Sequence, residues 1–331
     1  MATPSSSPKI LPSGATGYVG GSVLHRLLNH PSLTSILSPS NPITLPVLPG
    51  GGDRIPKLTA TYGPRVKPVA TTSLDDVATL TALAAEHDVK KTAAATSETS
   101  GQQQQPAVWM IPTSGCPNIS DKPITGDARP DVEYDDADSA AVFAFEAAQN
   151  EQEWCWSRCA WARSWASTPS ASRRRASSAP AEGPFQQAGL MIPVMMASVL
   201  RQGYGVMAGD GTGDIDYVPT SLTWLMFYVL CVLNIVKHGG SGVQTGRRGI
   251  IFPTAGRTLT RDIAQRCLDV AFAVAHLPLE GGPQNKEIRT LSLEESASMT
   301  AGNLYIAETG LASHYKTKGT AARTRLGWKP I

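Results

Sequence analysis

Three glycines near the start of the chain have the spacing of a phosphate-binding turn. They stand in the run Gly14-Ala-Thr-Gly17-Tyr-Val-Gly20. A side chain at such positions would block the tight turn and hold a phosphate away from the backbone amides, whereas glycine leaves those amides accessible. Where a helix begins at such a turn, its dipole also favours a negative charge. The run therefore predicts a binding site for the diphosphate of a dinucleotide.

The residues on either side of this run predict the elements that would position it. Lys9-Ile10-Leu11 is a short apolar segment typical of a strand, and residues 22–28 place apolar side chains at helical spacing. A glycine run between a strand and a helix is stronger evidence than a glycine run alone. The alternative is an ordinary glycine turn that binds nothing. We expect the cradle to consist of Gly14, Thr16, Gly17, Tyr18, Val19 and Gly20.

Strand-like and helix-like segments alternate along the rest of the chain. Expected strands cover 43–48, 66–69, 107–111 and 249–252, and Thr113-Ser-Gly115 follows the third of these as a strand-to-loop exit. Pro46 weakens the prediction of a strand over 43–48, because proline cannot donate a hydrogen bond to a strand ladder. Expected helices cover 74–85 with Ser73 as its cap, 191–200, 220–236 and 260–275. This order predicts an α/β fold with a doubly wound parallel sheet.

Composition narrows the classes of partner and compartment. With 29 basic and 27 acidic side chains among 331 residues, the chain lacks the positive footprint of a nucleic-acid-binding protein. We expect small-molecule or protein partners. Five cysteines without regular spacing fit a reducing compartment, which we take to be the cytoplasm.

Residues 1–8 form a loose tail without the pattern of a secretory signal. The apolar run 222–236 is shorter than the roughly 20 residues of a membrane span and predicts a buried core helix.

The glycine run, written out as Ser-Gly-Ala-Thr-Gly-Tyr-Val-Gly-Gly, closely resembles the cofactor loop of the extended and atypical short-chain dehydrogenase/reductases, including the NmrA-like and epimerase/dehydratase-like branches. Four further segments resemble parts of that family: Ser73-Leu-Asp-Asp76, Thr113-Ser-Gly115, Gly183-Pro-Phe185 as the start of the substrate-side segment, and Gly327-Trp-Lys-Pro330. The resemblance implies a Rossmann sheet with a smaller C-terminal substrate-side subdomain, a nicotinamide cofactor, and hydride transfer on a carbonyl or hydroxyl substrate.

The family's general acid is absent. That acid is a tyrosine whose pKa is lowered by a lysine four positions later. Tyr134, Tyr204 and Tyr315 are followed at that spacing by Asp138, Ala208 and Gly319. The helix that would carry the pair reads Phe143-Ala-Phe-Glu146. Ser114 is the nearest match to the family's substrate-orienting serine, but it is better explained as a strand-end serine that caps backbone amides. The catalytic residues therefore stay unassigned.

The choice between NADP and NAD rests on the end of the second expected strand. In NAD-binding relatives an acidic residue there takes the ribose hydroxyls. Here the strand is followed by Asp53, which comes late, and by Arg54, which could meet a 2′-phosphate. These residues favour NADP slightly over NAD.

Two segments interrupt the resemblance. Residues 90–106 form a low-complexity loop that contains four consecutive glutamines, and it follows Asp88-Val89 where the fourth strand should continue. Residues 153–180 hold four of the seven tryptophans and match no helix or strand pattern. Translation of these codons in the neighbouring reading frame gives a sequence that resembles the family's helix ending in Leu-Gly-Val. We hypothesise that this segment is frame-shifted, through a sequencing or gene-model error or through gene decay, and that the fold is incomplete around its fourth and sixth strands.

These observations predict a domain organisation and a ranked set of functions. Residues 9–180 would form the dinucleotide-binding core, and 181–331 the remaining Rossmann elements interleaved with the substrate-side subdomain. Cys155-x-x-x-Cys159 lacks a second pair, so no metal site is expected. The leading hypothesis is an NAD(P)-binding protein of oxidoreductase ancestry without nucleic-acid or membrane partners. The alternatives are a non-catalytic NAD(P)-sensing regulator of the NmrA type and a non-functional product of a damaged gene.

Overall fold

A computed structural model describes residues 8–48, 53–73, 76–87, 89–90, 109–115, 119–120, 131–149, 171–174, 176–177, 183–185, 191–209, 211–218, 221–274, 277, 286–300, 302–314 and 316–330. The predicted tail except Pro8, the low-complexity loop except Lys90, and most of 153–180 lie outside these residues.

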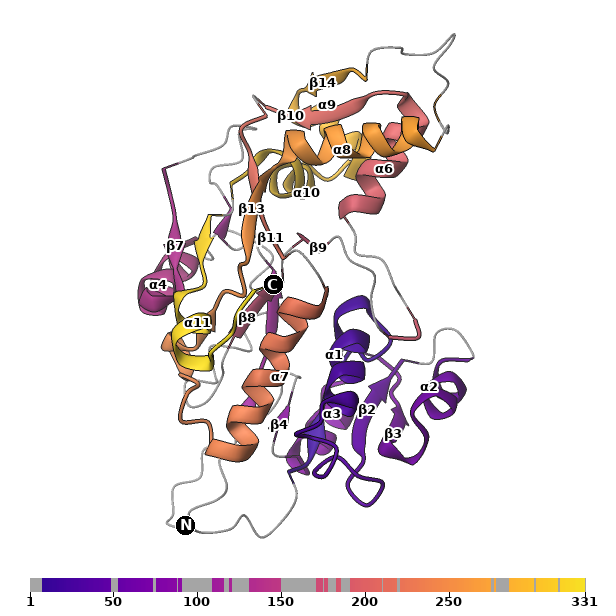
Figure 1. Ribbon diagram of the computed structural model, residues 1–331, viewed down its shortest axis with the longest axis vertical. Helices are drawn as coiled ribbons and strands as arrows, with labels where there is room; N and C mark the ends of the chain where they lie inside the picture. The colour runs from indigo at the N-terminus through magenta and orange to yellow at the C-terminus, as the bar shows by residue number, and fades with distance from the viewer. Residues whose placement is uncertain are drawn as a thin grey trace.

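A parallel sheet organises the lower part of the molecule (Figure 1). Two hydrogen-bonded ladders form it, β1-β4-β5 and β6-β8-β12, and β5 continues into β6 along the chain. The pair β2-β3 adjoins β1 and completes the order β3-β2-β1-β4-β5/β6-β8-β12. This is the doubly wound order, so the predicted fold class is confirmed. The strands are β1 (Ile10–Leu11), β2 (Ile43–Val47), β3 (Val66–Ala70), β4 (Val89–Lys90), β5 (Trp109–Met110), β6 (Thr113–Gly115), β8 (Ala171–Arg174) and β12 (Ile250–Ile251).

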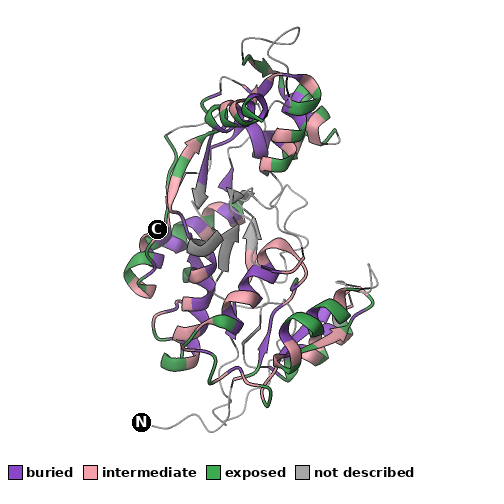
Figure 2. Cartoon of the chain, turned by 45° about the vertical axis from the view of Figure 1, so that its right-hand side comes forward, coloured by how far each residue is buried: buried purple, intermediate pink, exposed green. Residues whose placement is uncertain are grey.

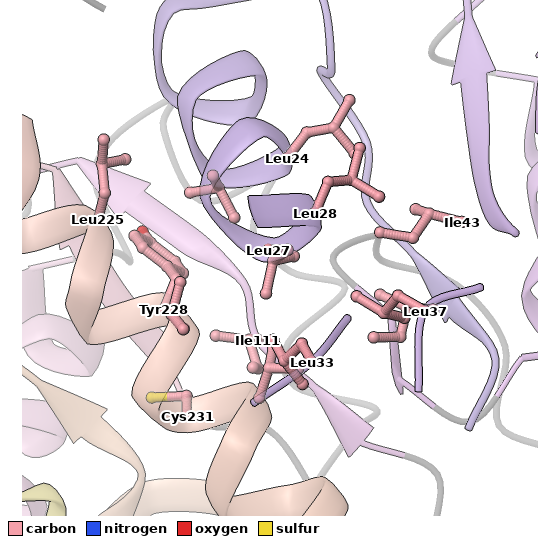
Figure 3. Close-up of a cluster of buried hydrophobic side chains, with 14 of the residues drawn as sticks. Leu24, Leu27, Leu28, Leu33, Leu37, Ile43, Ile111, Leu225, Tyr228 and Cys231 are labelled. Carbon is pink, nitrogen blue, oxygen red and sulfur yellow. The ribbon is translucent and has the colours of Figure 1, made fainter. Parts of the chain in front are cut away.

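The core of this part lies between the sheet and two helices, α1 (Tyr18–Asn29) and α7 (Ser221–His238). In Figure 3, Leu24 and Leu28 of α1 lie toward Ile43 of β2, and Leu27 lies toward Ile111, which follows β5. Tyr228 and Cys231 of α7 belong to the same cluster, and all of these side chains are almost fully buried. The apolar run 222–236, which lies in α7, thus forms a buried core helix, as predicted. No helix among the described residues is long and apolar enough to cross a membrane.

Two further helices cover the sheet. They are α2 (Arg54–Tyr62), which joins β2 to β3, and α3 (Val77–Ala85), which leads toward β4. Figure 2 shows buried and exposed positions on opposite sides of such helices, as expected for amphipathic elements that pack on a sheet. The cap of α3 differs from the prediction. Asp76, not Ser73, accepts the hydrogen bond from the Thr79 amide at 3.0 Å, because its carboxylate lies directly before the first turn.

The upper part of the molecule has its own apolar cluster (Figure 1). The parallel pair β10 (Gly205–Ala208) and β14 (Ile288–Leu291) lies beside α6 (Met191–Gln202) and α8 (Thr260–Ala273). Two short helices, α9 (Leu293–Ala297) and α10 (Leu304–Ala307), complete it. Gly209 and Gly213 lie between β10 and the next strand, β11 (Asp214–Val218). The two strands do not form a hairpin, because β10 pairs with β14 while β11 pairs with other strands.

β11 connects the two parts through polar contacts. It runs antiparallel to β13 (Gly256–Leu259) and parallel to β9 (Ala176–Ser177). Its buried Asp216 accepts hydrogen bonds from the amide and hydroxyl of Thr317 at 2.9 and 2.6 Å and pairs with Arg257 at 3.2 Å. Asp214 lies 2.7 Å from Nδ1 of His314. These bonds attach the C-terminal segment to β11, and β15 (Thr317–Lys318) then pairs with β7 (Tyr134–Asp135).

The structure fills the two sheet positions where the sequence suggests that the fold is incomplete. β4 stands between β1 and β5, and β8, which falls inside 153–180, stands between β6 and β12. A parallel ladder is made by backbone groups, so a segment without a strand-like side-chain pattern can still pair between two strands. Both strands are short, but neither position in the strand order is vacant.

Candidate dinucleotide-binding site

The glycine run forms a tight turn between β1 and α1. Gly14 has a φ of +71°, in the left-handed region that favours glycine. The chain then turns back on itself, because the Gly17 amide donates to the Gly14 carbonyl at 2.9 Å. Gly17 is the N-cap of α1, and its own carbonyl accepts from the Gly21 amide at 2.9 Å. Strand, turn and helix are therefore continuous, as the sequence predicts.

Gly20 allows α1 to start directly beneath the turn. A Cβ at this position would lie 2.1 Å from the Gly14 carbonyl oxygen and 2.5 Å from its carbonyl carbon. Both atoms belong to the backbone, so a larger residue would force the turn and the helix apart. The third glycine of the run thus sets the distance between helix and turn.

The outer side of the turn remains open. An added Cβ on Gly14 meets no atom within 4 Å, and one on Gly17 meets only the Gly14 carbonyl oxygen at 3.4 Å. The first turn of a helix leaves amide groups without an intrahelical acceptor, and the N-cap glycine has no side chain that could cap them. Thr16, Tyr18 and Val19 are half-buried around these amides. A turn of small residues at a helix start is the kind of backbone that can bind phosphate, and the six residues predicted for the cradle all lie in this turn and the first turn of α1.

The cradle lies at the carboxyl edge of the parallel sheet. Leu11 of β1 and Met110 of β5 stand in register through Lys90 of β4. Gly14 and Thr113 each follow those residues by three positions, so both come directly after the carboxyl ends of β1 and β5, the two strands that flank β4. This edge is where ligands bind in open α/β sheets.

Two tyrosines among the described residues have surroundings that do not suit a general acid. Thr113 Oγ1 lies 2.8 Å from the hydroxyl of Tyr228, but Tyr228 is buried between α7 and α1. Tyr62 of α2 lies 3.5 Å from His25 Nδ1 of α1, and burial raises the pKa of Tyr62 to about 12. A tyrosine with such a pKa holds its proton too firmly for acid catalysis near neutral pH.

The helix that follows β6 carries the segment in which the sequence lacks the tyrosine–lysine pair. In α4 (Ser139–Gln149), Phe143 is followed four positions later by Ala147, one helical turn away. The guanidinium of Arg247 lies 5.3 Å from the Phe143 ring. An aromatic ring without a hydroxyl and an alanine cannot supply a proton or lower a pKa. Among the described residues no group of three or more His, Cys, Asp or Glu could hold a metal ion.

The residues predicted to choose the cofactor lie at the start of α2. Asp53 is the N-cap of this helix and is exposed, and Arg54 is its first residue and is half-buried. Both follow β2, next to the strand that carries the glycine turn. The side chain of Ser114, the other residue considered in the sequence, lies outside the described side chains.

A contact that the sequence does not indicate brings residues 183–185 to this site. A Cβ on Gly183 would lie 2.9 Å from the carbonyl carbon of Gly21, so the two glycines touch through their backbones. Phe185 packs on the apolar cluster of α1, and Lys57 Nζ of α2 lies 5.2 Å from its ring centroid. By resemblance this segment is the start of the substrate side, and in the structure it lies against the helices that flank β2. No local pattern could reveal a contact between residues so far apart in the chain.

Comparisons with known proteins support the fold. No family model and no curated protein matches the sequence. Among solved structures, a dTDP-glucose 4,6-dehydratase from Streptomyces venezuelae with NAD bound is similar with a TM-score of 0.57 at 15% identity, over 98% of this chain and 92% of that one. A UDP-glucuronic acid 4-epimerase from Bacillus cereus with UDP-glucuronic acid and NAD is similar with a TM-score of 0.55 at 13% identity, over 98% and 94%. At these identities the similarity shows the fold alone.

Proposed function

We propose that this protein binds a nicotinamide dinucleotide, NADP or NAD, with its diphosphate on the turn from Gly14 to Gly20. The observation that carries the proposal is the open cradle of glycines at the start of α1, on the carboxyl edge of a doubly wound sheet. Gly14, Thr16, Gly17, Tyr18, Val19 and Gly20 would enclose the diphosphate and the adjoining ribose. The NAD-bound dehydratase and epimerase that share the fold support the same choice of ligand.

The ancestry that we infer is that of an oxidoreductase, in which the bound nicotinamide supplies or accepts a hydride on a carbonyl or hydroxyl substrate. Residues of this chain would bind and orient the cofactor. The upper part, with α6, α8 and β10, would provide the substrate side, in line with the proposed division after residue 180. We also propose a cytoplasmic location and a small-molecule substrate.

A second candidate function is dinucleotide sensing without turnover. Phe143 and Ala147 occupy one face of α4 at the spacing that a tyrosine and a lysine would need, and this observation favours binding over catalysis. The third interpretation, a product without function, predicts that folded protein binds no dinucleotide.

Titration of NADPH and NADH into purified protein tests the proposal. We expect saturable binding by the wild type and a loss of at least about tenfold in affinity for Gly17→Val, because the new side chain would stand where the diphosphate meets the amides. Ala140→Val, at an exposed position of α4, is the matched control and should bind normally. A cofactor-oxidation screen with aldehydes and ketones then separates an enzyme from a sensor. Wild-type protein that binds neither dinucleotide, or a Gly17→Val variant with unchanged affinity, contradicts the proposal.

A further inference from the structure

Two stretches of the chain carry positive charge without any acidic side chain. Residues 217–261 and 309–331 contain no Asp or Glu, yet ten Lys or Arg residues lie in them. The whole chain is nearly balanced, with 29 basic and 27 acidic side chains. The positive charge is therefore concentrated locally, and such an asymmetry within a chain indicates a surface for an anionic partner.

The fold brings the two stretches together in the lower part of the molecule. The first contributes α7 and the turn Gly246–Arg248, and the second contributes α11 (Thr320–Leu326), which packs on α7 (Figure 1). Arg325 of α11 donates a hydrogen bond to the side-chain oxygen of Gln244. A Cβ on Gly242 would lie 3.1 Å from the Arg325 carbonyl oxygen, so the two backbones are also close.

Five cationic side chains lie on this region, and we call them the basic edge. They are Arg247, Arg248, Arg323, Arg325 and Lys329. Arg325 is half-buried and the other four residues are exposed. In the part of the chain that the structure describes, none of the five forms an ion pair. Their charges are therefore available to a partner.

Three of these arginines are held in place by uncharged groups. Besides the bond from Arg325, Arg323 donates to the carbonyl oxygen of Thr254 at 2.8 Å. The guanidinium of Arg247 lies 5.3 Å from the ring centroid of Phe143. A side chain that is already held loses less conformational entropy when it binds. The basic edge is thus preorganised for an anionic ligand.

The turn of the basic edge lies at the opposite edge of the sheet from the glycine turn. Gly246–Arg248 comes directly before β12, at the amino end of that strand. The glycine turn instead follows the carboxyl end of β1. The strands of both ladders run parallel, and β5 continues into β6, so these are opposite edges of one sheet. A partner bound at Arg247 and Arg248 would leave the dinucleotide site accessible.

We propose that the basic edge binds an acidic segment of another protein through the carboxylates of its Asp or Glu side chains. Each guanidinium presents its N–H donors in a planar fork, which matches a carboxylate with two parallel hydrogen bonds. The pairing is electrostatic and needs no apolar groove, in keeping with a surface made of exposed cations.

Two other anionic partners fit this surface less well. A membrane surface is best bound where apolar side chains accompany the cations. Among the described residues, none of the exposed large apolar side chains lies in α7, α11 or the turn between α7 and β12. Single-stranded nucleic acid needs exposed aromatic faces for its bases. Trp328, the ring 5.7 Å from the Arg323 guanidinium, is only 1% exposed.

Fluorescence polarisation with a labelled all-glutamate peptide of about ten residues tests the proposal on the full-length protein. We expect saturable binding at about 30 mM salt that weakens at least about tenfold at about 300 mM, because salt screens exposed charges. The double variant Arg247→Gln with Arg248→Gln should weaken the peptide at least about fivefold, as the loss of two exposed ion pairs predicts.

Matched variants separate loss of charge at this surface from other effects. Arg261→Gln with Arg266→Gln removes the same charge from exposed positions of α8 and should change the affinity by less than about twofold. Arg247→Lys with Arg248→Lys keeps the charge and should retain most of the affinity, which distinguishes lost charge from unfolding. NADPH affinity should equal that of the wild type in all three double variants.

Several outcomes overturn the proposal. The first is a wild-type protein that does not bind the peptide, and the second is equal peptide affinity in the two glutamine double variants. A third is tighter binding of a single-stranded oligonucleotide or of phosphatidylserine vesicles than of the peptide. The last is a salt-sensitive dimer that Arg247→Gln with Arg248→Gln abolishes, because the occupant would then be a second copy of this chain.

Discussion

Gly20 shows how one absent methyl group sets the geometry of the phosphate turn. A residue within a helix normally gains stability when glycine is replaced by alanine, by about 1 kcal/mol. At Gly20 the added Cβ would instead lie 2.1 Å from the Gly14 carbonyl oxygen, a contact that real structures do not tolerate. The steric cost of an alanine at position 20 opposes its gain in helix propensity. The sign of the change in unfolding free energy therefore reveals which of the two is larger.

We therefore expect Gly20→Ala to lower the free energy of unfolding by about 1–3 kcal/mol, the usual cost of overpacking. Dinucleotide affinity should fall with it, because α1 and the turn would separate. Urea denaturation followed by circular dichroism measures the first effect, and NADPH titration measures the second. A variant that is more stable than the wild type would show that helix and turn are not in the contact described here.

At the scale of elements, the contact between α1 and α7 supports the cradle from below. Leu24, Leu27 and Leu28 of α1 and Tyr228 of α7 are at most 2% exposed and converge in one cluster (Figure 3). The helix whose amides would face the proposed ligand is thus held by apolar burial along its length. The hydrogen bond from Thr113 to Tyr228 adds a polar contact between β6 and α7.

Truncation of this cluster should destabilise the whole lower part. Leu27→Ala is expected to reduce the free energy of unfolding by about 2–5 kcal/mol, because it removes buried methyl groups and leaves a cavity. Leu304→Ala makes the same chemical change at a position of α10 that is 43% exposed, and it should cost less than about 1 kcal/mol. Chemical denaturation of both variants provides the comparison. Equal losses would contradict the assignment of Leu27 to the core.

At the scale of the whole molecule, Asp136 connects segments that are distant in the sequence. Its carboxylate accepts from the Phe252 amide beside β12 at 2.9 Å and from the Ala321 amide in α11 (Thr320–Leu326) at 2.6 Å. The side chain is fully buried. Burial raises the pKa of Asp136 to about 6, while the two amide bonds oppose that rise and the nearby Asp135 adds to it.

This raised pKa predicts a pH dependence of stability. The folded state holds the proton more tightly than the unfolded state, so the contribution of Asp136 is largest below about pH 4 and is lost as the pH rises through about 6. The full change is up to about 3 kcal/mol. Asp136→Asn cannot titrate, so the difference in unfolding free energy between wild type and variant should decline from pH 4 to pH 7. Urea denaturation of both proteins across this pH range measures the difference. A difference that stays constant with pH would refute the raised pKa of Asp136.

The sequence by itself determined the features that depend on neighbours along the chain. The glycine turn, the helix after it and the core helix 222–236 follow from local conformation and from apolar spacing, which act over a few residues. The absence of a tyrosine–lysine pair is also evident from the residues alone, as Phe143 and Ala147 show.

Only the tertiary structure decided the contacts between distant segments. The pairing of β8 between β6 and β12 depends on backbone groups of its neighbours and not on its own side-chain pattern. The approach of Gly183 to Gly21, and with it the place of Phe185, depends on two missing Cβ atoms in different parts of the chain. Such contacts form because the folded sheet brings these backbones together, and periodicity within one segment carries no information about them.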